Sequence, residues 1–147
     1  MPGFQTIGVI TKQSDPRLSD TLQTLLDFLA SRALQVLVDE SAASLLNGET
    51  TELVSRERLA READLAIVVG GDGTLLNAGR SLADADVPVL GINLGRLGFL
   101  VDVSPEEMTA RIDEILSGDY REARRFLLDA EVIRGAQVVG RAVALND

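Results

Sequence analysis

Three glycines, an aspartate and a threonine in immediate succession, Gly70-Gly71-Asp72-Gly73-Thr74, form the stretch of this sequence best suited to chemistry. Glycines permit backbone conformations closed to other residues and let a ligand approach the backbone N–H groups. We expect Thr74 to open a helix, whose N-terminus adds unpaired donors and a partial positive charge. Because such a loop binds phosphate, we predict phosphate contacts from Gly70, Gly71, Gly73 and Thr74.

The carboxylate of Asp72 stands in the middle of this loop and would repel phosphate unless it served another group. That group could be a metal ion or a hydroxyl held for attack, which indicates phosphoryl transfer. The alternative is a tight strand-to-helix turn in which Asp72 only caps the helix. Two better-known phosphate loops are excluded, because no G-x-x-x-x-G-K-[ST] occurs and Leu76 replaces the third glycine of G-x-G-x-x-G.

Composition restricts the chemistry further. The 147 residues suffice for a domain that buries about 68–70% of its unfolded surface. A net charge of −9 and 3% aromatic residues argue against a nucleic-acid partner or an anionic membrane. The absence of cysteine and histidine excludes thiol catalysis, Ser-His triads, disulfides and the usual zinc sites. Catalysis would then use carboxylates, Lys or Arg, backbone dipoles and a hard cation such as Mg²⁺.

The elements that must position the loop alternate along the chain. Apolar runs predict strands at 5–11, 35–38, 65–69 and 87–92, and helical spacing or capping signals predict helices at 19–33, 56–63, 74–83 and 104–117, with a helical turn at 41–47. This alternation predicts an α/β fold, a mostly parallel sheet with helices on both faces. Ligands bind beyond the carboxyl ends of such strands, where Asp72, Asn93, Thr11 and Lys12 would lie.

The pattern changes after Gly118, where two extended segments, 120–133 and 138–145, follow each other without a helix. Arg134-Gly135-Ala136-Gln137 between them predicts a hairpin. We expect residues 1–118 to form an α/β nucleotide-binding domain and residues 119–147 to begin a second, antiparallel β domain that this chain does not complete. The alternative is a hairpin that folds back on the first domain. Neither a signal peptide nor a membrane-spanning stretch is evident, so we expect a cytoplasmic protein.

Three segments together resemble the NAD kinases. The glycine loop matches the family's glycine-rich motif, residues 91–100 (Gly-Ile-Asn-Leu-Gly-Arg-Leu-Gly-Phe-Leu) match its next block, and Ala144-Leu145-Asn146-Asp147 match the start of a third. The first motif also occurs in diacylglycerol and sphingosine kinases and in phosphofructokinases, whereas the second is more specific. The order and spacing of the three extend the resemblance over essentially the whole chain.

The resemblance implies ATP-dependent phosphorylation of the 2′-hydroxyl on the adenosine ribose of NAD, which gives NADP. It implies Asp72 as the catalytic carboxylate, NAD contacts from Asp72, Gly73, Asn146 and Asp147, and a divalent metal on the donor. It also implies a homo-oligomer and a second domain that completes the NAD pocket, so we expect the isolated chain to be inactive. The alternatives are a lipid kinase of the diacylglycerol type and a non-catalytic nucleotide-binding domain.

Overall fold

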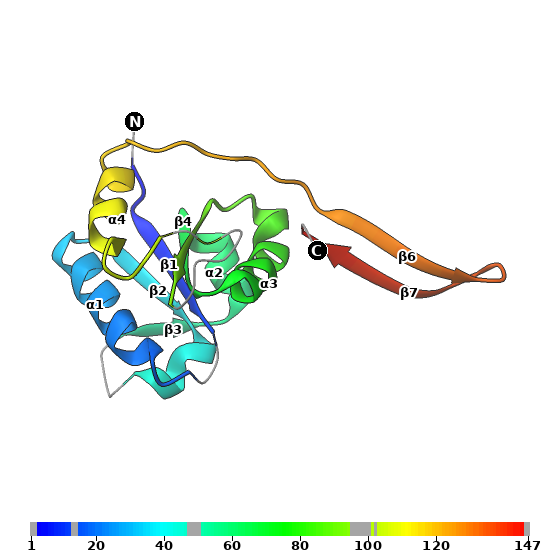
Figure 1. Ribbon diagram of the computed structural model, residues 1–147, viewed down its shortest axis with the longest axis horizontal. Helices are drawn as coiled ribbons and strands as arrows, with labels where there is room; N and C mark the ends of the chain where they lie inside the picture. Colours follow the sequence, from blue (N-terminus) through cyan, green and yellow to red (C-terminus); the bar gives the residue numbers. More distant parts are fainter. Residues whose placement is uncertain (1–2, 13–14, 47–50, 95–100, 102, 146–147) are drawn as a thin grey trace.

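The computed structural model describes residues 3–12, 15–46, 51–94, 101 and 103–145. Its main body is a five-stranded parallel sheet in the order β3-β2-β1-β4-β5 (Figure 1). The strands span Thr6–Thr11 (β1), Gln35–Asp39 (β2), Glu52–Val54 (β3), Leu65–Gly70 (β4) and Val89–Asn93 (β5). From β1 the strand order runs outward in one direction to β3 and in the other through β4 to β5. The point where the order reverses lies between β1 and β4.

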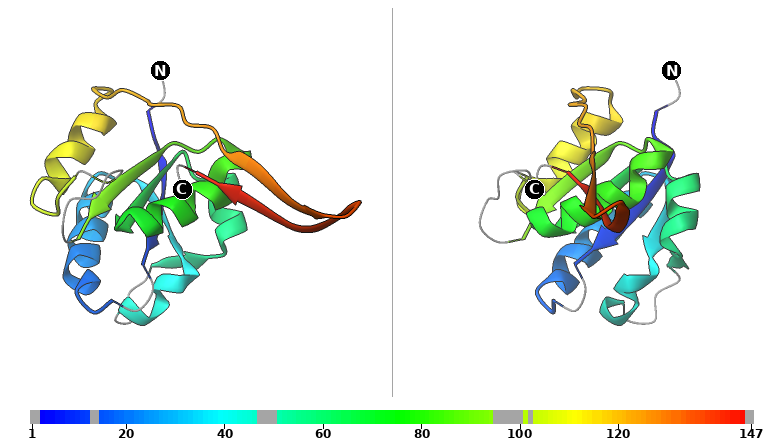
Figure 2. Two further views of the ribbon diagram at one scale, coloured as in Figure 1. Left: turned by 45° about the vertical axis from the view of Figure 1, so that its right-hand side comes forward. Right: turned by 90° about the vertical axis from the view of Figure 1, so that its right-hand side faces the viewer.

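Helices cover both faces of the sheet (Figure 2). The helices are α1 (Leu18–Ser31), α2 (Arg56–Glu62), α3 (Asp72–Leu82) and α4 (Met108–Leu116), with short 3-10 turns at Glu40–Leu45 and Ala83–Ala85. On one face, leucines of α1 and apolar residues of α4 pack against Ile7, Val9 and Ile67. On the other, Leu59 of α2 and Ala78 and Leu82 of α3 pack against Ile10 and Val68. Strands buried on both faces explain the nearly continuous apolar runs in the sequence.

The α/β fold predicted from the sequence is confirmed, with differences at the ends of elements. Helix α3 begins at Asp72 rather than Thr74, because the carbonyl of Gly71 already accepts a helical hydrogen bond from Leu75 at 3.1 Å. Helix α4 begins at Met108 rather than near residue 104. It follows a turn in which the Ser104 hydroxyl accepts a hydrogen bond from the Glu107 amide at 3.3 Å. Edge strand β3 escaped prediction because it has three residues, of which only Val54 is buried.

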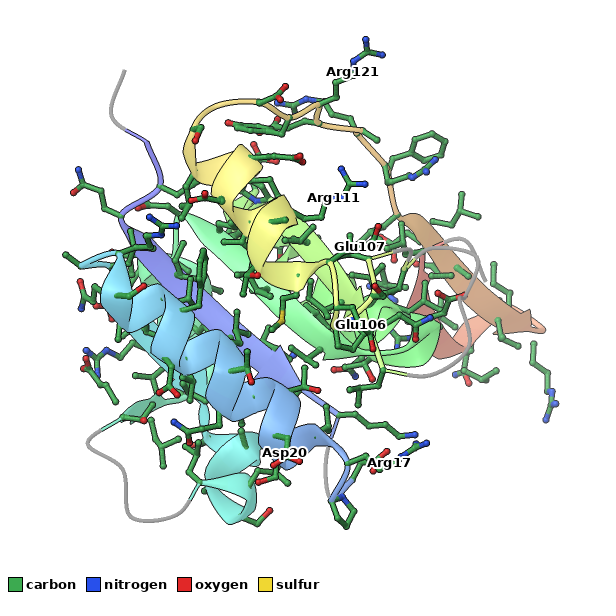
Figure 3. The ribbon with its side chains drawn as sticks, turned by 60° about the vertical axis from the view of Figure 1, so that its left-hand side comes forward. Arg17, Asp20, Glu106, Glu107, Arg111 and Arg121 are labelled. Atoms are coloured by element: carbon green, nitrogen blue, oxygen red, sulfur yellow. The ribbon has the colours of Figure 1, made fainter. Side chains whose placement is uncertain are left out.

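A two-stranded antiparallel hairpin, β6 (Leu128–Arg134) and β7 (Gln137–Ala144), projects from this body (Figure 1). Its turn places Gly135 at a φ of +64°, as the first central position of a two-residue turn requires. The preceding segment was predicted as a strand from residue 120, but pairing starts only at Leu128. Figure 3 shows Arg121 of this segment pointing away from the body. The hairpin meets the body at α3, where Leu145 packs on Gly79.

Candidate functional site

A pocket of about 470 Å³ opens at the carboxyl edge of the sheet, where the strand order reverses. Ligands of doubly wound α/β sheets bind at this kind of position. The end of β1, the turn after β2, the start of α2 and the first turns of α3 contribute the residues that line it: Ile10, Thr11, Lys12, Ser41, Arg56, Gly71, Gly73, Thr74 and Asn77. A chain of strongly negative net charge thus places two cations, Lys12 and Arg56, on one pocket.

The first turn of α3 presents two different faces. At about 100° per residue, Gly73, Thr74 and Asn77 share one side of the helix, and all three line the pocket. Asp72 lies on roughly the opposite side of the same turn. There its Oδ1 atom accepts a hydrogen bond of 3.1 Å from the backbone amide of Val101. The N-terminus of α3 therefore separates the pocket from the carboxylate and borders both.

The glycines of the loop do not adopt the unusual backbone conformations that the sequence suggested. Among the residues that the structure describes, only Gly118 and Gly135 are glycines of positive φ, and Gly71 is extended at φ −127°, ψ −165°. Within the described part of the chain, a Cβ on Gly71 or Gly73 would meet no atom within 4 Å. These two glycines therefore leave open space beside the backbone, which a ligand can use. Our expectation of unusual backbone conformations at this loop was wrong.

Gly70 has a different role from its neighbours. It ends β4, is buried, and lies outside the residues that line the pocket. A Cβ there would lie 2.6 Å from Oγ1 and 2.9 Å from Cβ of Thr74, so this glycine lets the first turn of α3 pack directly onto the strand. Of the residues that we predicted to contact phosphate, Gly71, Gly73 and Thr74 border the pocket. Gly70 does not, but it packs against Thr74. Asn146 and Asp147 lie outside the described residues.

One hydroxyl at the pocket is buried without a partner. Thr11 is 3% exposed, and its Oγ1 atom makes no hydrogen bond to any of the described residues. An unsatisfied buried polar group costs about 1–3 kcal/mol. Thr11 ends the central strand β1 and lines the pocket. A ligand or a water molecule in the pocket could therefore hydrogen-bond to this hydroxyl.

A partly buried ion pair, with Asp39 4% and Arg56 23% exposed, holds the pocket wall formed by β2, α2 and α3. Arg56 donates to both carboxylate oxygens of Asp39, at 2.9 and 3.2 Å, and its third nitrogen donates to the Ser81 hydroxyl at 2.9 Å and to Asn77 Oδ1 at 3.4 Å. The Ser41 hydroxyl also donates to Asp39. Burial pushes the pKa of the Asp39 carboxyl up, but the hydrogen bonds from Arg56 and Ser41 outweigh it, and the net pKa lies below its usual value.

Sequence reasoning missed Ser41, Arg56 and Asn77 as pocket residues. One signal was available for Arg56, which is the first residue of α2. The helix dipole disfavours a cation at that position, so a carboxylate from elsewhere in the chain was to be expected beside it. The sequence could not show that this carboxylate is Asp39, because Asp39 is 17 residues away on another element.

The described part of the chain contains no helix long and apolar enough to cross a membrane. Nor do the described residues include a group of three or more Asp or Glu side chains that could hold a metal ion. The pocket instead presents ammonium, guanidinium, hydroxyl and backbone groups. The ammonium, the guanidinium and the backbone N–H groups are hydrogen-bond donors, which bind phosphate oxygens rather than a cation.

The fold and this pocket define an α/β domain of the class that holds its ligand at a topological switch point. A family model of the ATP-NAD kinase N-terminal domain matches residues 7–120. The chain therefore belongs to the ATP-NAD kinase family, whose N-terminal domain it contains.

Curated relatives support the same family. The chain is 49% identical to the NAD kinase of Nitrosococcus oceani over 98% of this chain and 49% of that protein. It is also 49% identical to the NAD kinase of Chromohalobacter salexigens over 100% of this chain and 50% of that protein. The chain thus spans about half the length of the curated relatives that it matches.

Two solved structures share the fold. The yeast NADH kinase, in a complex with NADH, superposes with a TM-score of 0.79 at 20% identity, over 98% of this chain and 47% of that one. The NAD kinase from Archaeoglobus fulgidus, in a complex with ATP, gives 0.56 at 21% identity, over 91% and 45%. At these identities the likeness concerns the fold alone.

Proposed function

We propose that this chain is part of an NAD kinase, which transfers the γ-phosphoryl group of ATP to the 2′-hydroxyl of the adenosine ribose of NAD. The carrying observation is the first turn of α3, which has a cationic pocket on one side and the Asp72 carboxylate on the other. Phosphoryl transfer needs the donor phosphorus and the acceptor hydroxyl within about 3.5 Å of each other, and both environments border the N-terminus of α3, where the two groups would meet. The family match favours this acceptor over the lipid of a diacylglycerol kinase.

In this proposal the pocket holds the phosphates of the donor. The amides at the N-terminus of α3 and the Lys12 ammonium would neutralise phosphate oxygens, and the Thr11 hydroxyl would hydrogen-bond to one of them. The charge of Arg56 is already compensated by Asp39, so Arg56 would serve mainly to hold the pocket wall. Mg²⁺ would enter as the counterion of these phosphates and offset their charge. The pocket side chains are suited to the phosphates and not to the cation, so we assign no residue of this chain to the metal.

Asp72 would orient the acceptor. The ribose oxygen attacks the γ-phosphorus, the bond from phosphorus to the β-phosphate oxygen breaks, and ADP leaves. A carboxylate is a weak base towards a ribose hydroxyl, but the transition state of phosphoryl transfer is largely dissociative and needs little early deprotonation. Asp72 would therefore hold the hydroxyl in line and accept its proton late in the reaction. Gly73, Asn146 and Asp147 are the further residues that we propose to contact NAD.

We also propose that residues 119–147 begin a second domain, which would complete the NAD site and support a homo-oligomer. Two observations favour this. The hairpin β6–β7 exposes several large apolar side chains, and curated relatives are about twice as long as this chain. A two-stranded hairpin is at best marginally stable alone, so further chain or a partner must cover it.

The first test is NADP formation from NAD, ATP and Mg²⁺ by the protein expressed from its whole reading frame. We expect activity in the wild type and a fall in kcat of about 10²–10⁴ in Asp72→Asn, with little change in NAD affinity. Asp84→Asn, in the exposed turn after α3, is the matched control and should retain activity. An Asp72→Asn enzyme with normal turnover would exclude the assigned role. Nucleotide binding without any turnover in the wild type would instead favour a binding module.

A further inference from the structure

A short stretch of chain connects the edge of the sheet to the candidate catalytic carboxylate. Val103 forms a parallel bridge with Ile92 of β5, and its carbonyl accepts from the Asn93 amide at 2.7 Å. Two residues earlier, the amide of Val101 donates to Asp72 Oδ1 at 3.1 Å. Val103 is thus bonded to β5, and Val101 is bonded to Asp72.

The side chain of Val101 packs on the backbone of Gly91. It is 1% exposed, and a Cβ added to Gly91 would lie 2.9 Å from its Cγ2 atom and 3.3 Å from Cγ1. Valine has a strongly restricted χ1 angle, and a buried valine has little room to rotate away. A methyl group on Gly91 would therefore push Val101 off the strand. Glycine inside a strand often marks such a close approach.

We propose that Gly91 is a positioning residue for Asp72 and acts through Val101. Glycine at this position lets Val101 lie close enough to β5 for its amide to reach the carboxylate. The hydrogen bond is charge-assisted and directional, so it contributes to fixing the rotation of the carboxylate at the start of α3. The inference rests on the proposed function only in that Asp72 is taken as the carboxylate that orients the acceptor hydroxyl.

Gly91→Ala should then impair the reaction without impairing binding. In the protein expressed from its whole reading frame we expect kcat to fall about ten- to a hundredfold, because a misplacement of about 1 Å in a catalytic group has effects of that size. The KM values for NAD and ATP should change little, because Gly91 is not among the residues that line the pocket.

A second substitution provides the decisive comparison. The Cβ atom of Val101 would lie 3.5 Å from the added methyl group, which is an ordinary contact. Val101→Ala removes both methyl groups that clash and keeps the amide. Gly91→Ala should therefore have no further effect on kcat in a Val101→Ala background. If the double variant is as impaired as Gly91→Ala alone, the route through Val101 is wrong.

Gly8→Ala is the matched control. A Cβ at Gly8 would lie 2.6 Å from a methyl carbon of Leu59, so it introduces a comparable clash in central strand β1, against α2. It should lower the melting temperature while kcat of the folded enzyme stays near that of the wild type. An equal loss of kcat in Gly8→Ala and Gly91→Ala would overturn the proposal, since a general loosening of the sheet would then explain both.

The hydrogen bond can also be tested without activity. By NMR we expect slow hydrogen exchange at the residue 101 amide in the wild type, faster exchange in Asp72→Ala and Gly91→Ala, and slow exchange again in Gly91→Ala/Val101→Ala. Unchanged exchange in Gly91→Ala would contradict the proposal. If the wild type makes no NADP, the proposed function fails, and the exchange data still decide whether Gly91 controls this contact.

Discussion

At the scale of single residues, Arg56 does more for the pocket than its one charge indicates. Its guanidinium joins Asp39 at the end of β2 to Asn77 and Ser81 on α3, and it is itself the first residue of α2. Three elements that are distant in the sequence are thus held by one planar group with five donors. The Asp39 side chain is 4% exposed, so each charge depends on the other for its compensation.

This ion pair predicts a particular pH dependence of stability. The pKa of Asp39 is lowered in the folded chain, because the hydrogen bonds from Arg56 and Ser41 outweigh the effect of burial. A carboxyl of this kind stabilises the fold above its unfolded pKa, and the stabilisation is lost as the pH falls through its folded pKa. Asp39→Asn should therefore lower the free energy of unfolding by about 1.5–3 kcal/mol at neutral pH.

The difference between wild type and Asp39→Asn should shrink as the pH falls below about 4. Urea unfolding of both proteins from neutral pH down to about pH 3 measures it. Asp27→Asn, on the exposed side of α1, is the control that should follow the wild type. If the difference in the free energy of unfolding stays constant over the whole pH range, Asp39 stabilises the fold through packing and neutral hydrogen bonds rather than through its charge.

Residue roles could be predicted from the sequence only where the partners are local. The glycine loop was recognised because strand, loop and helix start follow one another within residues 65–74. The contact of Asp72 with Val101 spans 29 residues. Nothing in the local sequence specifies that Val101 packs on Gly91 or that its amide then points at Asp72, because both depend on how the chain returns to the sheet after β5.

At the scale of elements, the start of α3 determines what the glycine loop can do. Strand β4 and helix α3 were expected from the sequence, since a buried apolar run and helical spacing are strong local signals. The exact start of the helix was not, because the N-terminal turn of a helix is fixed by backbone hydrogen bonds rather than by apolar spacing. Asp72 and Gly73 proved to be helical residues, which changes the expected effect of substituting the glycine.

Gly73→Ala should separate stability from binding. A methyl group there meets none of the described residues within 4 Å, and Gly73 lies inside α3. Alanine favours a helix over glycine by about 0.5–1 kcal/mol, so the melting temperature should stay constant or rise. The methyl group would nevertheless occupy space beside the pocket, and ATP binding measured by calorimetry should weaken. Unaltered ATP affinity in a folded Gly73→Ala protein would place the phosphates elsewhere.

At the scale of the whole molecule, the body and the hairpin are built differently. The body buries both faces of its sheet under helices. This could be predicted because the inner strands read as nearly continuous apolar runs, whereas the short edge strand β3 does not. The hairpin leaves Leu128, Val132 and Val143 substantially exposed. The hairpin itself was predicted from its turn residues. The sequence does not show what covers its apolar side chains, because the covering residues lie outside the turn and the two strands.

Val132→Asp tests whether this hairpin belongs to a second domain. Val132 is 59% exposed and pairs with Gly140. In the 147-residue chain, a substitution at so exposed a position should change the free energy of unfolding by about 0.5 kcal/mol or less. In the protein expressed from its whole reading frame, the second domain that we propose would bury this side chain, and the same change should then cost several kcal/mol, on the order of 2–5.

Asp129→Lys is the control for this comparison, because Asp129 is an exposed hairpin residue that pairs with Val143 and lies on the opposite face from Val132. It should be tolerated in both proteins if only the face of Leu128, Ala130 and Val132 is covered, since residues alternate between the two faces of a strand. Chemical denaturation of the four variants gives the result. Equal, small effects of Val132→Asp in both proteins would mean that this face stays in water, and residues 119–147 would then be an arm of the α/β domain rather than the start of another.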